Sequence, residues 1–518
     1  MSCSGWKLII RTCIILTRKV MQEKSSGYIL SIDSGTSGCK ASLWNEDGLM
    51  VKIRTEILER TFPRENYVEQ DPNMIWERQI ASIKSVTSEA GISYSEISSI
   101  GITNQRETVI AWDSETGLPL YNAISWMDRR TRSYEAKLKS RTKSIIKEKT
   151  GLVVDPYFSA MKMKWILNEI ARKRDKRFID RVRLGTVDSW LIWKLTSGKS
   201  HVTDYSNASR TLLFNIKEGK WDQELLEIFG IPENVLPEVV DSINPGIKTD
   251  PSVTGTEINI GGIAGDQQAS LFGHLAFEKG EMKNTYGTGS FLLVNAGETV
   301  PHTKRLISTV AWKEKGKRMV YAVEGSSFNT GSLLDWIRDG LKILNNSSES
   351  ETMAMQSPAD HGLYFVPALT GLGAPYWDNK VKGVIFGITP KVTQAEIVRS
   401  ALESIAFRIR DIVDTAKSET GINPIELKVD GKPTANNFLM QFQADILQIP
   451  VLRYSNFEMT SAGAAYMAGL TEKFWNVKRL RELNRVDKEF IPEIKKSDSD
   501  RYYRGWRRAI KSSLLLYD

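Results

Sequence analysis

One acidic residue stands between a short apolar strand and a helix in the stretch Ile263 to Ala269, which reads IAGDQQA. A carboxylate at the carboxyl end of a strand points out of the sheet into a crevice. Asp266 could there accept the proton of an attacking hydroxyl group, as a general base does. The same position also suits a helix N-cap, and the residue types alone do not separate the two roles.

Residues 33–38 form a Gly-, Ser- and Thr-rich turn between two short strands. Glycines let backbone N–H groups approach phosphate oxygens, and the hydroxyls add further donors. Lys40 supplies positive charge, and Asp33 could hold a hydrated magnesium ion, which uses one or two carboxylates and keeps several waters. An ordinary tight turn is the alternative. A second Gly-Thr turn at residues 287–289 could clamp a nucleotide from the other side.

Polar residues also follow the expected strand at residues 100–102. Arg106 and Glu107 lie there, and a fixed pair of guanidinium and carboxylate groups could hold the vicinal hydroxyls of a small polyol. A solvated ion pair is the alternative. Trp126 and Tyr157 could form the apolar wall that the carbon chain of a polyol needs, although each could equally be a core aromatic residue.

Several common motifs are missing from the sequence. Gly198-Lys199-Ser200 resembles the end of a P-loop, but Trp193 stands where the first glycine is required. The H-R-D and D-F-G signatures of protein kinases do not occur. The three cysteines form no C-x-x-C pair and the four histidines have no metal-ligand spacing. This pattern argues against a structural zinc site and indicates a reducing compartment.

Two runs of alternating strands and helices are expected to position these residues. In the first half we expect strands at 28–32, 40–44, 98–103 and 258–263 and a helix at 188–195. In the second half we expect strands at 291–294 and 427–429 and a helix at 397–417. A strand that runs into a Gly/Thr turn occurs in both halves, which is typical of two related α/β domains facing each other across a cleft.

The bulk composition indicates a globular protein of more than one domain. The chain has 518 residues, of which 41% are hydrophobic and 25% charged. The net charge of +8 is spread along the sequence, without the clustering that nucleic-acid binding requires, so we expect no nucleic-acid partner. We divide the chain into two domains, residues 27–274 and residues 275–518.

Residues 1–26 form an N-terminal extension to these domains. Their apolar run is short and interrupted by Arg11, whereas a membrane span needs about 20 apolar residues, so we expect no stable span. No small-residue cleavage site follows. We therefore expect the extension to be disordered or to result from a mis-assigned start, with Met21 as the true first residue, and the protein to be cytoplasmic.

Longer stretches carry a resemblance to a known family: GITNQRETVIAW at 101–112, YNAISWMDRRT at 121–131, TGLVVDPYFSAMKMKWIL at 150–167, LGTVDSWLIWKLTSG at 184–198, HVTDYSNASRTLLFNI at 201–216, GIAGDQQASLFG at 262–273, KNTYGTGSF at 283–291, PALTGLGAPYWD at 367–378 and ANNFLMQFQADIL at 435–447. Over about residues 27–512 the sequence resembles the FGGY carbohydrate kinases. The resemblance implies two ribonuclease-H-like domains, as in actin-like ATPases, with ATP and Mg²⁺ in the cleft. It further implies phosphorylation of glycerol to sn-glycerol 3-phosphate by a homodimer or homotetramer.

The resemblance also assigns roles to individual residues. Asp266 is implied to be the catalytic base. The implied glycerol contacts are Arg106, Glu107, Trp126, Tyr157, Asp266, Gln267 and Phe291. The implied nucleotide contacts are Thr36, Ser37, Gly38, Lys40, Thr288, Gly331, Asp335, Gly431, Lys432 and Asn436. Independently of the resemblance, Asp33 at the strand end could hold Mg²⁺ through water.

The sequence departs from the family pattern on the nucleotide side. Lys40 stands where arginine is usual, which keeps the charge but loses the bidentate geometry. Asp335 stands where glutamine is common. The family's usual Asp-Gly-Gly reads Asp430-Gly431-Lys432-Pro433 here, in which lysine adds bulk and proline removes a backbone donor. These changes bear on nucleotide affinity and preference, and leave the acceptor chemistry unaltered.

Two other functions are compatible with these patterns. The first is an FGGY kinase that acts on a pentulose or another sugar; against it, Arg106 and Glu107 with Trp126 and Phe291 match the small-polyol site as a set. The second is a non-catalytic, ATP-binding regulator of the actin-like class, suggested by the altered Lys432-Pro433 segment. Against the second function, all the acceptor-side residues are present, and a pure binder has no evident need of them.

Overall fold

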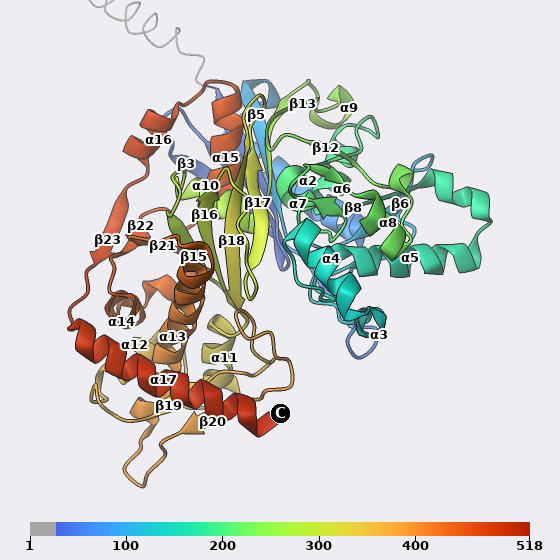
Figure 1. Cartoon of the computed structure of the whole chain (residues 1–518). Coiled ribbons are helices and arrows are strands. Elements are labelled where there is room, and N and C mark those ends of the chain that lie inside the picture. Colours follow the sequence, from blue (N-terminus) through green and yellow to red (C-terminus); the bar gives the residue numbers. More distant parts are fainter. Residues whose placement is uncertain (1–26, 518) are drawn as a thin grey trace, which may run out of the picture.

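The computed structural model describes residues 27–517, which form two α/β lobes, each built on a central mixed sheet (Figure 1). The expectations for residues 1–26 lie outside the described part of the chain. The two-lobed α/β architecture predicted from the sequence is confirmed.

The first lobe is built on sheet I, which within residues 27–517 has six strands in the order β13-β14-β5-β1-β2-β3. These are β1 (Tyr28–Ser34), β2 (Gly38–Trp44), β3 (Met50–Ile57), β5 (Ile97–Asn104), β13 (Ile243–Lys248) and β14 (Asn259–Gly265). The central strands β1, β5 and β14 are parallel. Their residues are buried almost throughout, since helices cover both faces of a sheet of this kind.

The second lobe is built on sheet II, which in the described part of the chain has seven strands in the order β17-β18-β16-β15-β21-β22-β23. These are β15 (Met282–Tyr286), β16 (Ser290–Gly297), β17 (Ile307–Lys313), β18 (Met319–Ser327), β21 (Leu427–Asp430), β22 (Val451–Tyr454) and β23 (Val486–Phe490). Its last six strands repeat the order and directions of sheet I, with β15 in the place of β1 and β21 in the place of β5. The two lobes are therefore related, as the repeated strand-and-turn pattern predicts.

Two helices exchange between the lobes. Helix α10 (Asp266–Gly273) follows β14 of sheet I but packs on β15 and β16 of sheet II, whereas α15 (Met459–Thr471) follows β22 of sheet II but packs on sheet I. The two helices lie against each other, and a Cβ at Gly463 would sit 1.7 Å from the carbonyl oxygen of Ala269. Only glycine allows so close an approach of two backbones. The lobes thus meet along a tightly packed helix pair, and the predicted division at residues 274/275 stays a prediction.

The other helices cover the outer faces and form an extension of the first lobe, on the right in Figure 1. In the first lobe these are α2 (Pro72–Ala90), α3 (Arg132–Lys137), α4 (Ser140–Thr150), α5 (Ser159–Lys173), α6 (Val187–Leu195), α7 (Tyr205–Ala208), α8 (Gln223–Phe229) and α9 (Pro251–Thr254). In the second lobe they are α11 (Gly331–Asp339), α12 (Glu349–Met355), α13 (Gln394–Thr420), α14 (Asn437–Leu447), α16 (Val477–Leu483) and α17 (Lys496–Tyr517). Short strand pairs join β4 (Glu69–Gln70) to β7 (Ala123–Ile124), β6 (Ile110–Asp113) to β8 (Val182–Gly185), β9 (Val202–Asp204) to β12 (Glu238–Val240), β10 (Phe214–Asn215) to β11 (Lys220–Trp221), and β19 (Tyr364–Val366) to β20 (Val384–Phe386).

The strands and helices expected from the sequence are all present, with ends that differ by a few residues. The helix expected at 397–417, for example, begins earlier because Thr393 and Glu396 form a capping box, and ends at Gly421 in a left-handed conformation. Among residues 27–517, no helix has both the length and the apolar character needed to cross a membrane.

Candidate active site

Asp266 is the first residue of α10, directly at the edge of sheet I. Gly265 holds the N-cap position, so the alternative role of Asp266 as the N-cap is wrong. Its side chain is 31% exposed, and its Oδ1 lies 3.2 Å from Nε of Arg106. The backbone N–H of Gln267 donates to the same oxygen at 2.7 Å. The positive end of the helix and the guanidinium therefore hold an accessible carboxylate in one orientation.

Arg106 joins the two lobes through a buried carboxylate that the sequence reasoning missed. Its Nη1 and Nη2 donate to Glu324 of β18 at 2.6 and 3.0 Å, a bidentate pair. Nη1 also donates to Oε1 of Gln268 at 3.2 Å. Burial opposes ionisation of Glu324, but Arg106 and Arg210 outweigh it and lower its pKa to about 2. The guanidinium of Arg106 is thus fixed beside Asp266.

Glu107 completes this buried charge cluster. Arg210 donates through Nε to Glu107 at 2.6 Å and through Nη2 to Glu324 at 3.1 Å. Arg106 and Glu107 are 3% and 1% exposed and pair with other residues instead of with each other, so the solvated ion pair is ruled out. Glu107 adopts a φ of 60°, which is uncommon for a residue with a side chain and is found where surrounding structure enforces it.

Aromatic residues lie next to this cluster. The rings of Trp126 and Tyr157 meet edge to face, with centroids 5.7 Å apart. Nε1 of Trp126 donates to Oγ1 of Thr36 at 2.9 Å, which connects the predicted acceptor wall to the predicted phosphate turn. Both rings are half-buried, and Tyr157 also packs against the core cluster that includes Phe158, so its position is compatible with both a core role and the proposed acceptor role. Phe291 is half-buried on sheet II, opposite Thr285 in the strand register.

The first predicted phosphate turn is closed by the N–H of Gly35, which donates to the carbonyl of Gly38 at 3.0 Å. Asp33 is buried at the end of β1, with Nζ of Lys40 4.0 Å from its Oδ2. Burial raises the pKa of Asp33 to about 6, and the nearby carboxylates of Glu458 and Asp266 add to this shift against the attraction of Lys40. Lys40 also donates to Oε2 of Glu458 at 2.7 Å.

The surroundings of Asp33 fit a hydrated cation. Within residues 27–517 no three His, Cys, Asp or Glu side chains gather into a metal cage. Mg²⁺ is commonly bound by one or two carboxylates and its own waters, so a lone carboxylate suits it. A bound cation would also favour the ionised form of Asp33, which burial and the neighbouring acids disfavour.

The second predicted turn is enclosed by two glycines from other segments. The N–H of Gly331, at the start of α11, donates to the carbonyl of Gly287 at 2.9 Å. Gly431 has a φ of 94°, and a Cβ there would lie 1.9 Å from the carbonyl oxygen of Tyr286. Thr288 at the tip is exposed. The predicted nucleotide residues Thr288, Gly331 and Gly431 therefore lie together.

Three further predicted nucleotide residues, Asp335, Asn436 and Lys432, lie on α11, at the N-cap of α14 and in the segment after Gly431. Asp335 pairs with Arg338 at 3.1 Å, and within residues 27–517 it has no hydrogen bond or ion pair to another predicted nucleotide residue. Asn436 caps α14 by accepting from the N–H of Leu439 at 2.9 Å. Lys432 is exposed and begins a short 3₁₀ helix (η4, Lys432–Ala435) in which Pro433 falls in the first turn, where its missing N–H costs nothing.

The sequence reasoning also missed several polar residues, of which Glu458 is half-buried and the others are buried. Glu324, Arg210, Lys283 and Glu458 each contact a predicted site residue. A signal existed for two of them, because Glu324 and Lys283 are single charges within strands that are otherwise apolar or uncharged. The partners of such a charge could not be read from the sequence, since they lie on other elements.

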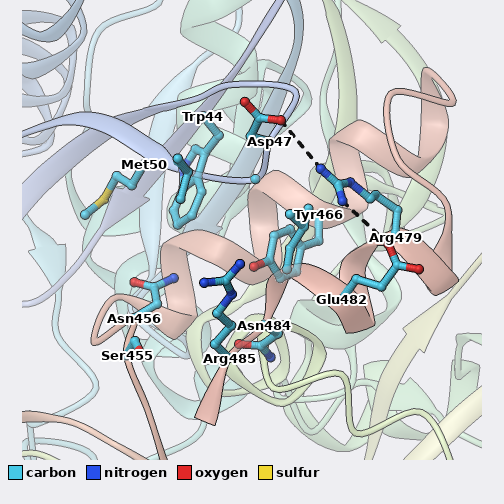
Figure 2. Close-up of a pocket in the computed structure, with 13 residues that line it drawn as sticks. Trp44, Asp47, Met50, Ser455, Asn456, Tyr466, Arg479, Glu482, Asn484 and Arg485 are labelled. Carbon is cyan, nitrogen blue, oxygen red and sulfur yellow. Dashed lines mark hydrogen bonds and ion pairs between the residues drawn. The ribbon is translucent and has the colours of Figure 1, made fainter. Parts of the chain in front are cut away.

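A separate pocket of about 540 Å³ lies between the β2–β3 turn and the segments around α16 (Figure 2). Its lining includes Trp44, Met50, Tyr466 and Arg485 and none of the predicted site residues. Arg479 in this pocket lies 3.5 Å from carboxylates of both Asp47 and Glu482, so its charge is largely balanced locally. This pocket is not part of the predicted acceptor or nucleotide site.

Known proteins are similar to this chain in both sequence and fold. Residues 28–273 match the FGGY family of carbohydrate kinases, N-terminal domain, and residues 282–472 match its C-terminal domain. Among curated proteins, a glycerol kinase of Caldanaerobacter subterraneus is 48% identical over 94% of this chain and 98% of its own length. Glycerol kinase 2 of Saccharolobus solfataricus is 47% identical over the same shares.

A solved structure agrees with this assignment. The glycerol kinase of Plasmodium falciparum, crystallised with ADP, is 35% identical, has a TM-score of 0.87, and covers 94% of this chain and 98% of its own. A gluconate kinase of Lactobacillus acidophilus, at 22% identity and a TM-score of 0.84, shares the fold. With both family domains matched in order, this chain belongs to the FGGY family of carbohydrate kinases.

Proposed function

We propose that this protein transfers the γ-phosphoryl group of ATP to a terminal hydroxyl of glycerol, giving sn-glycerol 3-phosphate. The observation that carries the proposal is the position of Asp266, an accessible carboxylate 3.2 Å from Arg106. Arg106 in turn belongs to a buried cluster with Glu107, Arg210 and Glu324. The names of the similar curated proteins support glycerol as the acceptor.

The acceptor would be held by charged and aromatic groups. Arg106 and Glu107 are fixed by their buried partners, so they can hold two vicinal hydroxyls without reorganising. Trp126, Tyr157 and Phe291 provide half-buried aromatic surface against which three carbons can lie. This arrangement suits a small polyol whose remaining hydroxyl points at Asp266.

Asp266 then acts as the general base. As the acceptor oxygen forms its bond to the γ-phosphorus, the bond to the departing ADP oxygen breaks, and the hydroxyl proton passes to a carboxylate oxygen of Asp266. The exposed Thr288 and the hydroxyls of Thr36 and Ser37 lie on the two turns that would contact phosphate oxygens. Donors placed where negative charge develops lower the barrier because they need no reorganisation.

Mg²⁺ is part of this proposal through Asp33. The ion, when bound, neutralises phosphate charge, and Asp33 would hold it through water. Lys40 lies between Asp33 and Glu458, so it can contribute positive charge beside Asp33. Closure of the two lobes around ATP would exclude water, which otherwise competes as the phosphoryl acceptor.

A panel of acceptors tests the proposal. ADP release would be measured with Mg-ATP alone and with glycerol, xylulose, ribulose or gluconate. We expect strong stimulation by glycerol and weak or no stimulation by the sugars. Stimulation by a sugar alone would keep the fold and move the substrate to another FGGY acceptor. Silence with every acceptor would contradict a kinase function and favour the ATP-binding regulator.

We further propose a cytoplasmic homodimer or homotetramer whose chain divides into residues 27–274 and 275–518. Light scattering on the purified protein measures the oligomeric state, and a monomer at micromolar concentration would contradict it. Limited proteolysis with the fragments identified by mass would show whether cleavage falls near residues 274–283.

A further inference from the structure

Lys283 is a fully buried lysine on β15 that the mechanism above does not use. Its side chain is 0% exposed, although it lies next to the acceptor site. Nζ donates to Oε1 of Gln267 at 2.6 Å and to Oγ1 of Thr285 at 2.8 Å. Burying an ammonium group is costly unless specific partners compensate. The burial of Lys283 beside these two partners therefore calls for a physical reason.

The contact between Lys283 and Gln267 fixes the orientation of an amide. An ammonium group has three donors and no acceptor. The end of Gln267 that faces Lys283 must therefore be its carbonyl oxygen, and its NH₂ group must point the other way. A side-chain amide without such a neighbour could present either its oxygen or its NH₂ group to the acceptor. Lys283 binds the oxygen, so Gln267 presents its NH₂ donors on the other side.

Gln267 directly follows Asp266 and, by the proposed function, contacts the acceptor. It lies on the face of α10 that turns toward sheet II, together with Ser270. A donor at Gln267 suits the oxygen of a glycerol hydroxyl other than the attacking one, whose proton passes to Asp266. The polarity of the acceptor site therefore depends on a residue that does not itself touch the acceptor.

Lys283 also connects this site to the nucleotide side. Thr285 lies 3.2 Å from the hydroxyl of Ser270, which donates to Oδ2 of Asp430 at 2.9 Å. Thr285 and Asp430 are partners in the strand register, and Asp430 directly precedes Gly431. One chain of hydrogen bonds thus runs from Gln267 to the segment that encloses the second turn.

We propose that Lys283 is a positioning residue for the acceptor: it orients the amide of Gln267 so that its NH₂ group donates to one hydroxyl of glycerol. This inference rests on the proposed function. Burial lowers the pKa of Lys283 to about 8, while the carboxylates of Asp430 and Asp266 favour the charged form, so the ammonium form is present near neutral pH.

The neighbouring strand offers a matched control. Lys428 is the register partner of Lys283, is 5% exposed, and extends from the same face of sheet II. Its Nζ instead pairs with Glu281 at 2.7 Å, away from Gln267. Replacing Lys428 by methionine removes a similar buried charge without changing the amide.

The test compares Lys283→Met and Lys428→Met with the wild type on glycerol, propane-1,2-diol and propane-1,3-diol. Losing one hydrogen bond to the acceptor corresponds to about tenfold in kcat/KM. We expect Lys283→Met to lower kcat/KM about tenfold for glycerol and for the diol that retains the hydroxyl bound by Gln267. The other diol should be little affected, and Lys428→Met should leave the ratios between acceptors unchanged.

A double variant separates positioning from general damage. In a Gln267→Leu background, Lys283→Met should cause little further loss for glycerol, because the amide it orients is gone. Lys283→Gln, which keeps a polar side chain, serves if the methionine variant does not fold. Additive losses in the double variant, or equal losses for all three acceptors, would overturn the proposal. If the wild type does not use glycerol, the proposed function is wrong about the acceptor, but the inference about Lys283 can still be tested. The variants are then compared on the acceptor that the panel identifies.

Discussion

The two lobes have the same strand order but exchange one pair of residues between their sheets. In sheet I, Asp33 of β1 lies opposite Thr103 of β5. In sheet II, the corresponding partners are Thr285 of β15 and Asp430 of β21, so the carboxylate and the hydroxyl have changed strands. At the same strand position, the first lobe thus presents the carboxylate of Asp33 and the second lobe presents the hydroxyl of Thr285.

The exchanged helices show a second difference. Helix α10 begins with Asp266, which contacts Arg106 of its own lobe, whereas α15 has Glu458 at its N-cap, which binds Lys40 of the other lobe. Both helix starts therefore carry a carboxylate that pairs with a basic side chain. In our account the carboxylate of Asp266 acts as the general base. The carboxylate of Glu458 holds the ammonium group of Lys40 on the nucleotide side.

The largest expected effect separates these two carboxylates. Asp266→Asn keeps the size of the side chain and removes the base, so kcat should fall by roughly 10²–10⁴-fold. ADP binding, measured by calorimetry, should change little. The matched variant Glu458→Gln should leave kcat within a few-fold and act mainly on the KM for ATP through Lys40.

Equal losses of kcat in both variants would show that the two helix starts are not different in function. Wild-type turnover in Asp266→Asn would refute its assignment as the base.

The next effect concerns the buried charge cluster between the lobes. Glu324→Gln leaves Arg106 and Arg210 without their shared carboxylate, and breaking a buried pair costs about 3–5 kcal/mol of unfolding free energy. The KM for glycerol should rise as well, because Arg106 loses its bidentate partner. Urea unfolding and acceptor titrations measure the two effects.

The pH dependence of this variant sharpens the test. The pKa of Glu324 lies at about 2 in the folded protein against 4.5 for an ordinary glutamate. The stability that its ionised form contributes is complete above pH 4.5 and is lost as the pH falls toward 2. The difference in unfolding free energy between wild type and Glu324→Gln should therefore shrink as the pH falls below 4.5; a difference that grows would contradict the ion-pair account.

A smaller effect distinguishes the glycines at the two turns. Gly431→Ala would place a Cβ 1.9 Å from the carbonyl oxygen of Tyr286 at a φ of 94°, whereas Gly38→Ala would place one 3.0 Å from the carbonyl of Glu56. The first substitution must displace the backbone of the second turn, so we expect the KM for ATP to rise several-fold more than with the second. Equal effects would show that the two turns tolerate a side chain equally.

The smallest expected effect is at Lys432. Because this side chain is exposed and Pro433 falls in the first turn of η4, the local backbone accommodates both. Lys432→Gly should change the KM for ATP by less than a few-fold and leave kcat unaltered. A large gain in ATP affinity would instead show that the lysine obstructs the nucleotide.

The sequence predicts the elements and their order because strand and helix patterns are local. It also indicates Asp266, Arg106 and both turns, since each follows an apolar strand. The buried partners are a different matter: Glu324 and Arg210 reach Arg106 and Glu107 across more than one hundred residues, and their pairing follows from the packing of two lobes. Likewise, the surface position of Asp335 depends on the direction of α11.

The most direct measurement is phosphorus NMR of a reaction containing Mg-ATP and glycerol. The account predicts a new phosphomonoester signal, coupled to the protons of a primary carbon, that grows in step with ADP for the wild type and is absent over the same period for Asp266→Asn. ADP accompanied only by inorganic phosphate, or equal product from both proteins, would contradict the claim that Asp266 directs phosphoryl transfer to glycerol.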